Sequence, residues 1–505
     1  MSTVAYTPAD EIPKIHTRAR QAYRSGKAKS VEFRKQQIAQ VGYMLKDNEE
    51  RFVQAAKQDL GRPEIETVLI DLSAVYIDVK LFYDNVEKWT KSRRVGFNLN
   101  FAPMSPRVKA EPKGVVLLIG PYNAPVFLLM SPLVGAIAGG NAVVLKPSEH
   151  SPATAALITE LVPKYLDPDL VHVINGGVPE TAAILELPWD HRSTRVGRIV
   201  AQAAGKHLTP LTLEACVCPE YVLVPRDFQD TFVAAVHEVY KSFYPDGPKN
   251  SDSLSRMVSE AHAARIKKLL DETKGTILFG GDVDILERYV GPTLVKDVKP
   301  DDALMSEEIF GPVLLVVPVN DLDEALEIIR SRDKPLAVYT FSPDSTFLAK
   351  VFDNTESGAV LANEVFIHLG VPGLPAGGVG ASGYGYYTGK EMFDQFTHLR
   401  VSLNNPSWYV IVLEPQVVPL RALMSESPLV RVDKIGFRFR FPPYKKENLK
   451  QLRALSPALP PRPKGKSGPA QNGQRWATWL AFILAGAVSF MLTGYGRDFV
   501  KGYPT

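Results

Sequence analysis

Between residues 114 and 176, short and continuously apolar runs alternate with helical segments. The apolar runs are GVVLLIG (114–120), AVVLKP (142–147) and VHVING (171–176), and the clearest helical segment is Pro152–Lys164. Strands that are apolar along their whole length are typical of parallel sheets with helices on both faces. The alternation therefore predicts an α/β fold built on a doubly wound parallel sheet.

Two long apolar stretches have to be judged as possible membrane spans. The stretch 114–145 is interrupted by prolines and by Gly139-Gly140, so we interpret it as soluble core. The stretch 476–495, WATWLAFILAGAVSFMLTGY, is about 20 uncharged residues, the length of a transmembrane helix, with tryptophan and tyrosine near its ends. A buried core helix is the alternative reading. We expect a tail anchor that leaves the rest of the chain in the cytosol. The N-terminus lacks the apolar core of a secretory signal.

The charge balance limits the kind of partner, and one segment has the composition of a linker. Lysine and arginine number 58 against 55 aspartates and glutamates, a formal net charge of +3. This near-neutral balance argues against a nucleic-acid partner held by a basic face. The segment Ser456–Gln474 is too rich in proline, glycine and lysine to bury a core, so we interpret it as a linker.

The chain has only two cysteines, Cys216 and Cys218, and both lie in TLEACVCPEYVLVPR directly after Glu214. In an extended segment their Cα atoms would stand roughly 7 Å apart, at the limit of disulfide geometry. A structural zinc site needs about four ligands, and the sequence has no second cysteine pair. From the residues alone, a reactive thiol and an inert packing pair both stay open, with a small metal or thiol module as the weakest reading.

Three further motifs carry polar groups at the ends of predicted strands: GPYNAP (120–125), AVVLKPSE (142–149) and EEIFGPVL (307–314). An amide in the first can point an N–H at a developing oxyanion. A lysine and a glutamate at the carboxyl edge of a parallel sheet suit a phosphate and a ribose. Each motif alone is equally consistent with an ordinary turn or a solvated charge.

Together with the cysteine segment, these motifs resemble the aldehyde dehydrogenase superfamily from about residue 31 to residue 405. Other segments resemble its class-3, fatty-aldehyde branch, namely INGGVPET (174–181), KHLTPLTLE (206–214), YVLVPRDFQD (221–230), RDKPLAVYTFS (332–342) and LPAGGVGASGYGYYTGKEMFDQFTHLR (374–400). The C-terminal apolar segment resembles the anchor of the membrane-bound members. Thr388 and Ala376 depart from this branch, which often has histidine and phenylalanine there.

The resemblance implies a role for each candidate site residue. Cys216 would be the nucleophile, Glu214 the base for the hydrolytic water and Asn123 the oxyanion donor. The cofactor-binding residues would be Lys146, Glu149, Ser193, Gly197, Glu308 and Phe310. Cys218 stands where the family has a small residue, which implies packing. The implied reaction is NAD(P)-dependent oxidation of an aldehyde, long-chain by resemblance, with NAD as cofactor, NADP possible, and no metal.

The resemblance also implies a domain organisation. The expected parts are an NAD-binding domain at 1–213 interrupted by an oligomerisation element near 85–104, a catalytic domain at 214–395, an oligomerisation strand at 396–415, a basic proline-rich tail and linker at 416–474, and a transmembrane anchor at 476–495. The expected partners are an aldehyde substrate, a second copy in a homodimer, and a membrane, which is that of the endoplasmic reticulum, the mitochondrial outer membrane or a lipid droplet.

Two gaps interrupt the resemblance. The family reads L-E-L-G-G and then a few dozen residues ending G-Q-x-C, whereas here Cys216 follows Glu214 by two positions. The family also has an apolar strand ending in T-G between the equivalents of His191 and Ser193, where only Arg192 stands. We therefore expect a central strand to be missing. We also expect base and nucleophile to be adjacent on one strand, with no room for a water between them.

These gaps support two hypotheses about the chain. Both are in frame with matching flanks, so we interpret the sequence as a defective gene model or splice product of a working aldehyde dehydrogenase. The alternative is a catalytically inactive, membrane-anchored relative with a scaffold or binding role. A carboxylate beside the thiol would raise the thiol pKa, which opposes thiolate formation.

Overall fold

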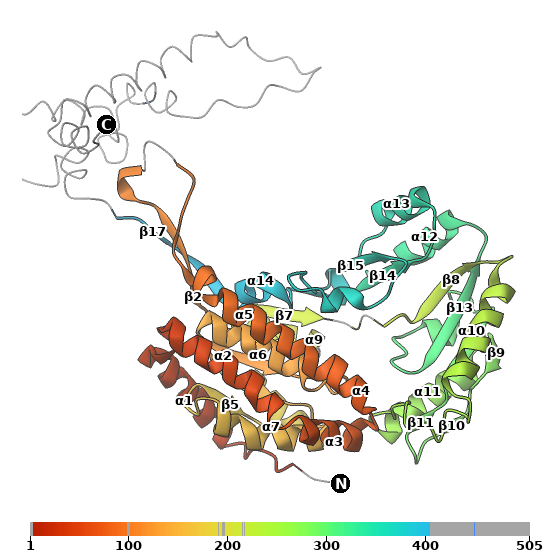
Figure 1. Ribbon diagram of the computed structural model, residues 1–505, viewed down its shortest axis with the longest axis horizontal. Helices are drawn as coiled ribbons and strands as arrows, with labels where there is room; N and C mark the ends of the chain where they lie inside the picture. The colour runs from red at the N-terminus through yellow and green to blue at the C-terminus, as the bar shows by residue number, and fades with distance from the viewer. Residues whose placement is uncertain are drawn as a thin grey trace, which may run out of the picture. The chain divides into compact units, whose positions relative to one another are not determined.

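The computed structural model describes residues 4–97, 102–189, 191–193, 197–214, 216, 218–404 and 449 (Figure 1). The chain divides into two units, 1–404 and 405–505, and the elements below all belong to the first. The expected tail at 416–474, apart from residue 449, and the expected anchor at 476–495 lie outside the described residues. Within the described ranges, no helix combines the length and the apolar character that crossing a bilayer requires.

Helices form the N-terminal part of the first unit. They are α1 (Glu11–Ser25), the 3₁₀ turn η1 (Lys27–Lys29), α2 (Val31–Lys46), α3 (Glu49–Leu60), α4 (Glu64–Glu66), the π-helix η2 (Thr67–Ser73) and α5 (Ala74–Thr90). The Ser30 hydroxyl accepts the Phe33 N–H and caps α2, while Gly61 ends α3 in the left-handed region at φ 59°. Asp47 and Asn48 separate α2 from α3.

The main sheet is doubly wound, as the sequence predicts. Its strands in spatial order are β16 (Gly383–Tyr384), β7 (Leu211–Glu214), β6 (His191–Ser193), β3 (Val115–Ile119), β4 (Ala142–Lys146) and β5 (Val171–Val173). The five strands from β7 to β5 run parallel, and β16 pairs antiparallel with β7. Every residue of β3 and β4 is buried, which explains their continuously apolar sequences.

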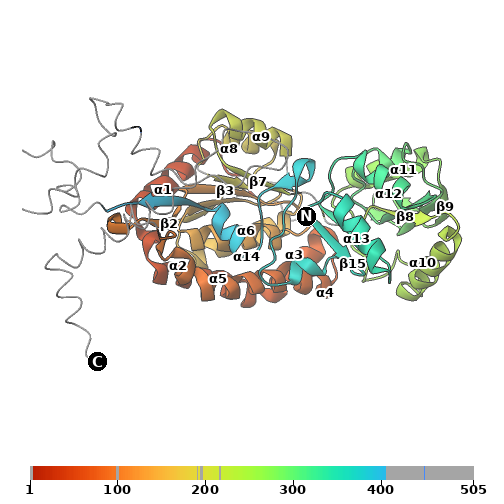
Figure 2. The same ribbon diagram turned by 90° about the horizontal axis from the view of Figure 1, so that it is seen from above.

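Helices cover both faces of this sheet. They are α6 (Phe127–Gly139), α7 (Pro152–Tyr165), α8 (Val178–Leu185) and α9 (Gly197–Lys206). Figure 2 shows α1, α8 and α9 on one face and α6 on the other, with α2 and α5 outside α6. One apolar core joins the strands to these helices and includes Val116, Leu117 and Val144, none of them exposed.

The expectation of a missing central strand is wrong in one respect, because a short strand stands in its place. β6 pairs in parallel with β3 through three residues, from Val116↔His191 to Leu118↔Ser193, and with β7 through two. The single residue Arg192 is thus enough to keep the order of the sheet. The cost is length, since β3 and β4 pair through five residues.

A second sheet forms the region after residue 220. Its strands in spatial order are β8 (Tyr221–Pro225), β13 (Val313–Val319), β12 (Thr293–Lys296) and β9 (Thr276–Phe279). The helices α10 (Gln229–Phe243), α11 (Glu260–Glu272) and α12 (Leu322–Arg330) accompany it, with a separate parallel pair, β14 (Ala337–Thr340) and β15 (Ala359–Ala362), around α13 (Ser345–Asn354). The smaller elements are β10 (Val283–Asp284), β11 (Tyr289–Val290), and the 3₁₀ turns η4 (Ala303–Met305), η5 (Ile367–Gly370) and η6 (Gly380–Ser382).

The predicted oligomerisation segments meet in a third sheet, but with different bounds. Its strands are β1 (Arg93–Arg94), β2 (Arg107–Pro112) and β17 (Thr397–Ser402), in that order. The element expected to begin near residue 85 begins later, because α5 continues to Thr90. The 3₁₀ turn η3 (Ala102–Met104) precedes β2, and α14 (Gly389–Gln395) packs on α6 and leads into β17.

Candidate active site

Two candidate cofactor residues, Lys146 and Ser193, lie at the carboxyl edge of the main sheet. β3 ends at Ile119, β4 at Lys146 and β6 at Ser193. The chain winds from β3 through β4 to β5 in one direction and continues through β6 to β7 in the other, so β3 and β6 flank the topological switch point. In open α/β sheets, ligands bind in the crevice outside the strand ends at this point.

Asn123 lies in the loop after β3, and a buried ion pair holds its backbone. The Arg62 guanidinium donates to the Asn123 carbonyl oxygen and pairs with Asp71 at 2.5 Å. Burial raises the pKa of the fully buried Asp71 despite the charge of Arg62. The Oδ1 atom of Asn123 is buried and accepts no hydrogen bond within the described part of the chain, which a bound molecule could supply.

Asp71 anchors the same loop from its other end. Its Oδ1 accepts the backbone N–H groups of Val126 (3.1 Å) and Phe127 (2.9 Å), where α6 begins. Arg62 and Asp71 therefore fix the backbone at Asn123 and in the residues that follow it. Sequence reasoning missed this support, although an aspartate inside the apolar run TVLIDL is a detectable signal of a buried polar contact.

Lys146 and Glu149 lie together, as the resemblance implies. The Lys146 ammonium, only 3% exposed, bonds to the Glu149 carboxylate three residues later. Burial opposes ionisation of Glu149, but hydrogen bonds from Lys146 and from its own backbone outweigh it, so its pKa is lowered. A charged pair at the end of a parallel strand fits a ribose and its hydroxyl groups.

Ser193 and Gly197 flank the short strand. Ser193 is the last residue of β6, opposite Leu118 of β3 and Thr212 of β7, and Gly197 is the first residue of α9. Both backbones therefore stand at the switch point, where a helix N-terminus can receive a phosphate. The intervening residues 194–196 and the side chains of 190–199 lie outside what the structure describes.

The loop that carries Glu308 and Phe310 is held by its backbone. From α11, Arg265 donates to the carboxylate of Glu307 and the carbonyl of Glu308, both at 3.1 Å, and to the carbonyl of Ile309. Phe310 adopts φ 51°, an uncommon backbone conformation for a side chain of its size. The loop is therefore fixed in one strained geometry.

Aromatic rings join this loop to the ends of β3 and β4. The Tyr122 ring lies 5.8 Å from Phe310, 5.9 Å from His150 and 5.5 Å from His262, measured between centroids. His150 and His262 lie 5.8 Å apart, and burial lowers the pKa of His262. This cluster places Phe310, predicted for the nicotinamide side, close to His150, which follows Glu149 in the chain.

Cys216 lies on the link between the two large sheets, half-buried, and Cys218 is exposed. We expected Glu214 and Cys216 on one strand, and this expectation is wrong. β7 ends at Glu214 and β8 begins only at Tyr221, so Cys216 lies between the two strands. The backbone of Glu214 pairs with Gly383 of β16, in the glycine-rich loop. The side chain of Glu214 and residues 215 and 217 are outside the described residues.

Sequence reasoning also missed Glu220, which precedes β8. Its Oε1 accepts the Ile309 N–H at 3.0 Å. Burial, with the negative charges of Glu308 and Cys216, raises the pKa of Glu220 to about 7. No pattern in CVCPEYVLV separates this glutamate from a solvated strand-end charge, because the partner is contributed by residue 309, far along the chain.

Thr388 and Ala376, where the sequence departs from the class-3 branch, bond to one another. The Thr388 hydroxyl accepts the Ala376 N–H at 2.9 Å and donates to the Leu374 carbonyl at 2.5 Å. Thr388 therefore shapes the glycine-rich loop that leads to β16.

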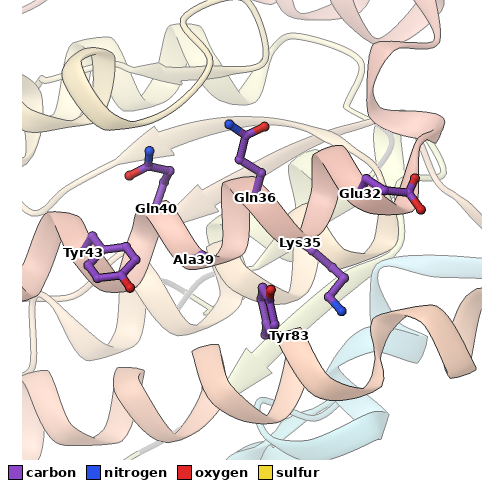
Figure 3. A pocket seen from close by; sticks show the side chains of 7 residues that line it. All are labelled: Glu32, Lys35, Gln36, Ala39, Gln40, Tyr43 and Tyr83. Carbon is purple, nitrogen blue, oxygen red and sulfur yellow. The ribbon is translucent and has the colours of Figure 1, made fainter.

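A groove of about 510 Å³ lies elsewhere, between α2 and α5. Figure 3 shows Tyr83 of α5 facing the side chains of α2, with the Lys35 ammonium 4.4 Å from the Tyr83 ring centroid. Its lining contains none of the predicted site residues, so we do not place the active site there. Within the described ranges, no cluster of three or more histidine, cysteine or carboxylate side chains could hold a metal ion.

Comparison with known proteins decides the family. The model of the Aldehyde dehydrogenase family matches residues 1–215 and 214–401, which together span most of the chain. The chain belongs to the aldehyde dehydrogenase family. It is thereby an oxidoreductase acting on aldehydes, as the sequence predicts. The two matches meet at residues 214–215, where the sequence analysis locates the second gap.

The relatives confirm the class-3 branch of the aldehyde dehydrogenases. The mouse aldehyde dehydrogenase family 3 member A2 is 39% identical over 422 residues, covering 76% of this chain and 87% of the relative. The Arabidopsis thaliana family 3 member H1 is 34% identical over 484 residues, covering 88% of this chain and 95% of the relative. Because 422 residues exceed 76% of 505, the mouse alignment includes residues that this chain lacks.

Solved aldehyde dehydrogenases share the fold. A substrate-bound Staphylococcus aureus AldH is 33% identical with a TM-score of 0.76, covering 78% of this chain and 94% of its own. The Bacillus cereus aldehyde dehydrogenase solved with NAD⁺ has a TM-score of 0.71 at 21% identity, covering 79% and 90%. The α/β, aldehyde dehydrogenase-like fold is therefore confirmed.

Proposed function

We propose that this chain carries the site of an NAD-dependent dehydrogenase of long-chain aldehydes, with Cys216 as its nucleophile. The observation that carries the proposal is the family match that resumes at residue 214 and includes Cys216 and Glu308. The class-3 motifs and the apolar segment 476–495 support a lipophilic substrate, because an enzyme at a lipid surface meets such aldehydes.

In this proposal, each step of the chemistry has a residue. The Cys216 thiolate attacks the aldehyde carbon, and the Asn123 amide donates to the oxyanion, an interaction worth roughly 3–4 kcal/mol in comparable sites. Glu214 occupies the family position of the base that activates water against the Cys216 thioester. Two contacts hold the backbone of this site. Arg62 donates to the Asn123 carbonyl, and Arg265 donates to the Glu308 carbonyl.

NAD is the proposed cofactor, with NADP as the alternative, and it supplies the hydride acceptor when bound. The buried Lys146–Glu149 pair would hold the adenosine ribose, and Glu149 favours a free 2′-hydroxyl over a 2′-phosphate. Ser193 and Gly197 would receive the phosphates, while Glu308 and Phe310 would hold the nicotinamide side.

A homodimer and a membrane attachment complete the proposal. Leu399 and Val401 are 59% and 74% exposed on the edge strand β17, which suits pairing with a second copy. A tail anchor at 476–495 would fix the chain to the endoplasmic reticulum, the mitochondrial outer membrane or a lipid droplet, with the catalytic part in the cytosol.

A second candidate is a membrane-anchored relative that has lost activity and serves as a scaffold. The spacing of two residues between Glu214 and Cys216 favours it. A defective gene model or splice product explains the same spacing. Sequencing the transcript across 187–221 separates these explanations. If every transcript lacks both family segments, the hypothesis of a defective gene model is excluded.

The decisive experiment compares two full-length proteins, the chain as written and a variant with family-like segments restored after His191 and Glu214. Each is given a long-chain aldehyde and NAD, and NADH formation is followed by absorbance. We expect the restored variant to form NADH. Activity of the chain as written would establish an active enzyme despite the gaps, and activity in neither would contradict the proposed function. Cys216→Ser in the active form is the matched control.

A further inference from the structure

The base of the hydrolytic step is the weakest part of this site. Glu214 ends β7 and lies only two residues before Cys216, whereas the family pattern separates base and nucleophile by a few dozen residues. The hydrolysis of a thioester nevertheless needs a carboxylate or imidazole that can take a proton from water near neutral pH. A second carboxylate close to Cys216 would meet this need.

Glu220 is such a carboxylate. It lies four residues after Cys216, so the backbone separates the two by at most roughly 14 Å. Its Oε1 is fixed by the Ile309 N–H at 3.0 Å, and the Phe310 N–H also bonds to it. Glu220 therefore ties the segment of the nucleophile to the loop of Glu308 and Phe310, the proposed nicotinamide side of the site.

We propose that Glu220, rather than Glu214, is the general base that hydrolyses the Cys216 thioester. This inference rests on the proposed function. The Glu220 carboxylate takes one proton from water while the water oxygen bonds to the thioester carbon. The C–S bond then breaks, the sulfur leaves as a thiolate, and the proton on Glu220 passes to the sulfur or to solvent. The products are the carboxylic acid and the regenerated Cys216.

The surroundings of Glu220 support this role. Burial raises its pKa to about 7, the charges of Glu308 and Cys216 add to the effect, and the N–H groups of Ile309 and Phe310 oppose it. Arg265 bonds to the Glu307 side chain and the carbonyls of the same loop. A base with a pKa near the working pH contributes typically 10²–10⁴-fold to rate. Because the ionised form accepts the proton, hydrolysis should rise with pH through about 7.

The test uses 4-nitrophenyl acetate, which acylates a reactive cysteine without any cofactor. In the full-length chain with Cys218→Ser, a burst of nitrophenolate counts acylated Cys216, and the slower phase reports thioester hydrolysis. Glu220→Gln keeps an oxygen that can accept the Ile309 N–H. We expect its burst amplitude to be unchanged and its slow phase to fall roughly 100-fold or more. We also expect the inflection near pH 7 to disappear from its slow phase.

The matched control is Glu272→Gln, an exposed glutamate of α11 that pairs with Lys268 at 3.8 Å, and it should keep both phases and the inflection. An unchanged slow phase in Glu220→Gln, or loss of the burst itself, would overturn the assignment of Glu220 to hydrolysis. Absence of a burst in the unmodified chain, with Cys216→Ser giving the same trace, would instead remove the proposed function and this inference with it.

Discussion

The ion pair of Lys146 and Glu149 is a largely buried contact at the end of β4, and the proposed site assigns it to the cofactor as well. Lys146 is almost fully buried, and its ammonium is neutralised by Glu149 at the end of β4. A lone buried charge is costly, so removing Glu149 should weaken the strand end as well as the ribose contact. The effect of removing Glu149 on the cofactor can be measured as NAD binding, without measuring catalytic activity.

We predict that Glu149→Ala weakens NAD binding about tenfold, or 1.4 kcal/mol, and narrows the preference for NAD over NADP. Titration calorimetry of the full-length protein with each nucleotide measures both effects. Glu32→Ala, a change in the groove between α2 and α5, is the control and should bind NAD normally. Equal NAD affinity in Glu149→Ala and the control would contradict the ribose assignment.

At the residue scale, contacts between side chains of one short motif can be predicted from the sequence, whereas contacts with side chains from distant segments cannot. Lys146 and Glu149 stand three positions apart, so their meeting at a strand end is predictable. The support of the Asn123 loop by Arg62 and Asp71 is not predictable, because those side chains lie 61 and 55 residues before the groups they bind. Glu220 gains its partner from residue 309 in the same way.

At the element scale, β6 is the most informative strand. The resemblance leaves one residue, Arg192, where the family has an apolar strand, which led us to expect none. The backbone still forms a ladder, because three residues are enough to pair with β3 and to keep β7 in the sheet. A comparison of motifs detects only that residues are missing. A strand can still pair when its sequence has changed, because the hydrogen bonds between strands use backbone groups that almost every residue has.

We predict that the amide protons of β6 exchange with solvent at least about 100-fold faster than those of β4. A ladder of two or three pairs opens locally at less cost than the buried five-residue pairing of β3 and β4. Hydrogen exchange followed by mass spectrometry on peptides covering 191–193 and 142–146 makes the comparison. Equal protection of the two peptides would mean that β6 belongs to the rigid core.

At the scale of the whole molecule, β17 forms one edge of the third sheet among the residues that the structure describes. Within the described residues, β17 pairs with β2 alone, and Leu399 and Val401 of β17, with Leu403 just after its end, are 59%, 74% and 62% exposed. Exposed apolar side chains on an edge strand are an association surface that monomers usually avoid. The predicted oligomerisation role of 396–415 is therefore consistent with the described part of that segment.

We predict that Val401→Lys shifts a dimer of the full-length chain towards monomer, because it places a charge in the row of exposed apolar side chains. Light scattering after size exclusion in detergent, over a range of protein concentrations, gives the mass. Lys268→Ala on α11 is the control and should leave the mass unchanged. A monomeric parent protein, or a variant that stays dimeric, would contradict the proposed dimer.

The direct run of chain from β7 to β8 acts as a short tether between the two large sheets. From Glu214 to Tyr221 it can extend over no more than roughly 25 Å, whatever the surrounding side chains do. The few dozen residues that the family pattern places between Glu214 and Cys216 are absent from this chain. The distance over which the two sheets can separate is therefore limited by this segment. A wide parting of the halves would have to stretch the thiol-bearing segment itself.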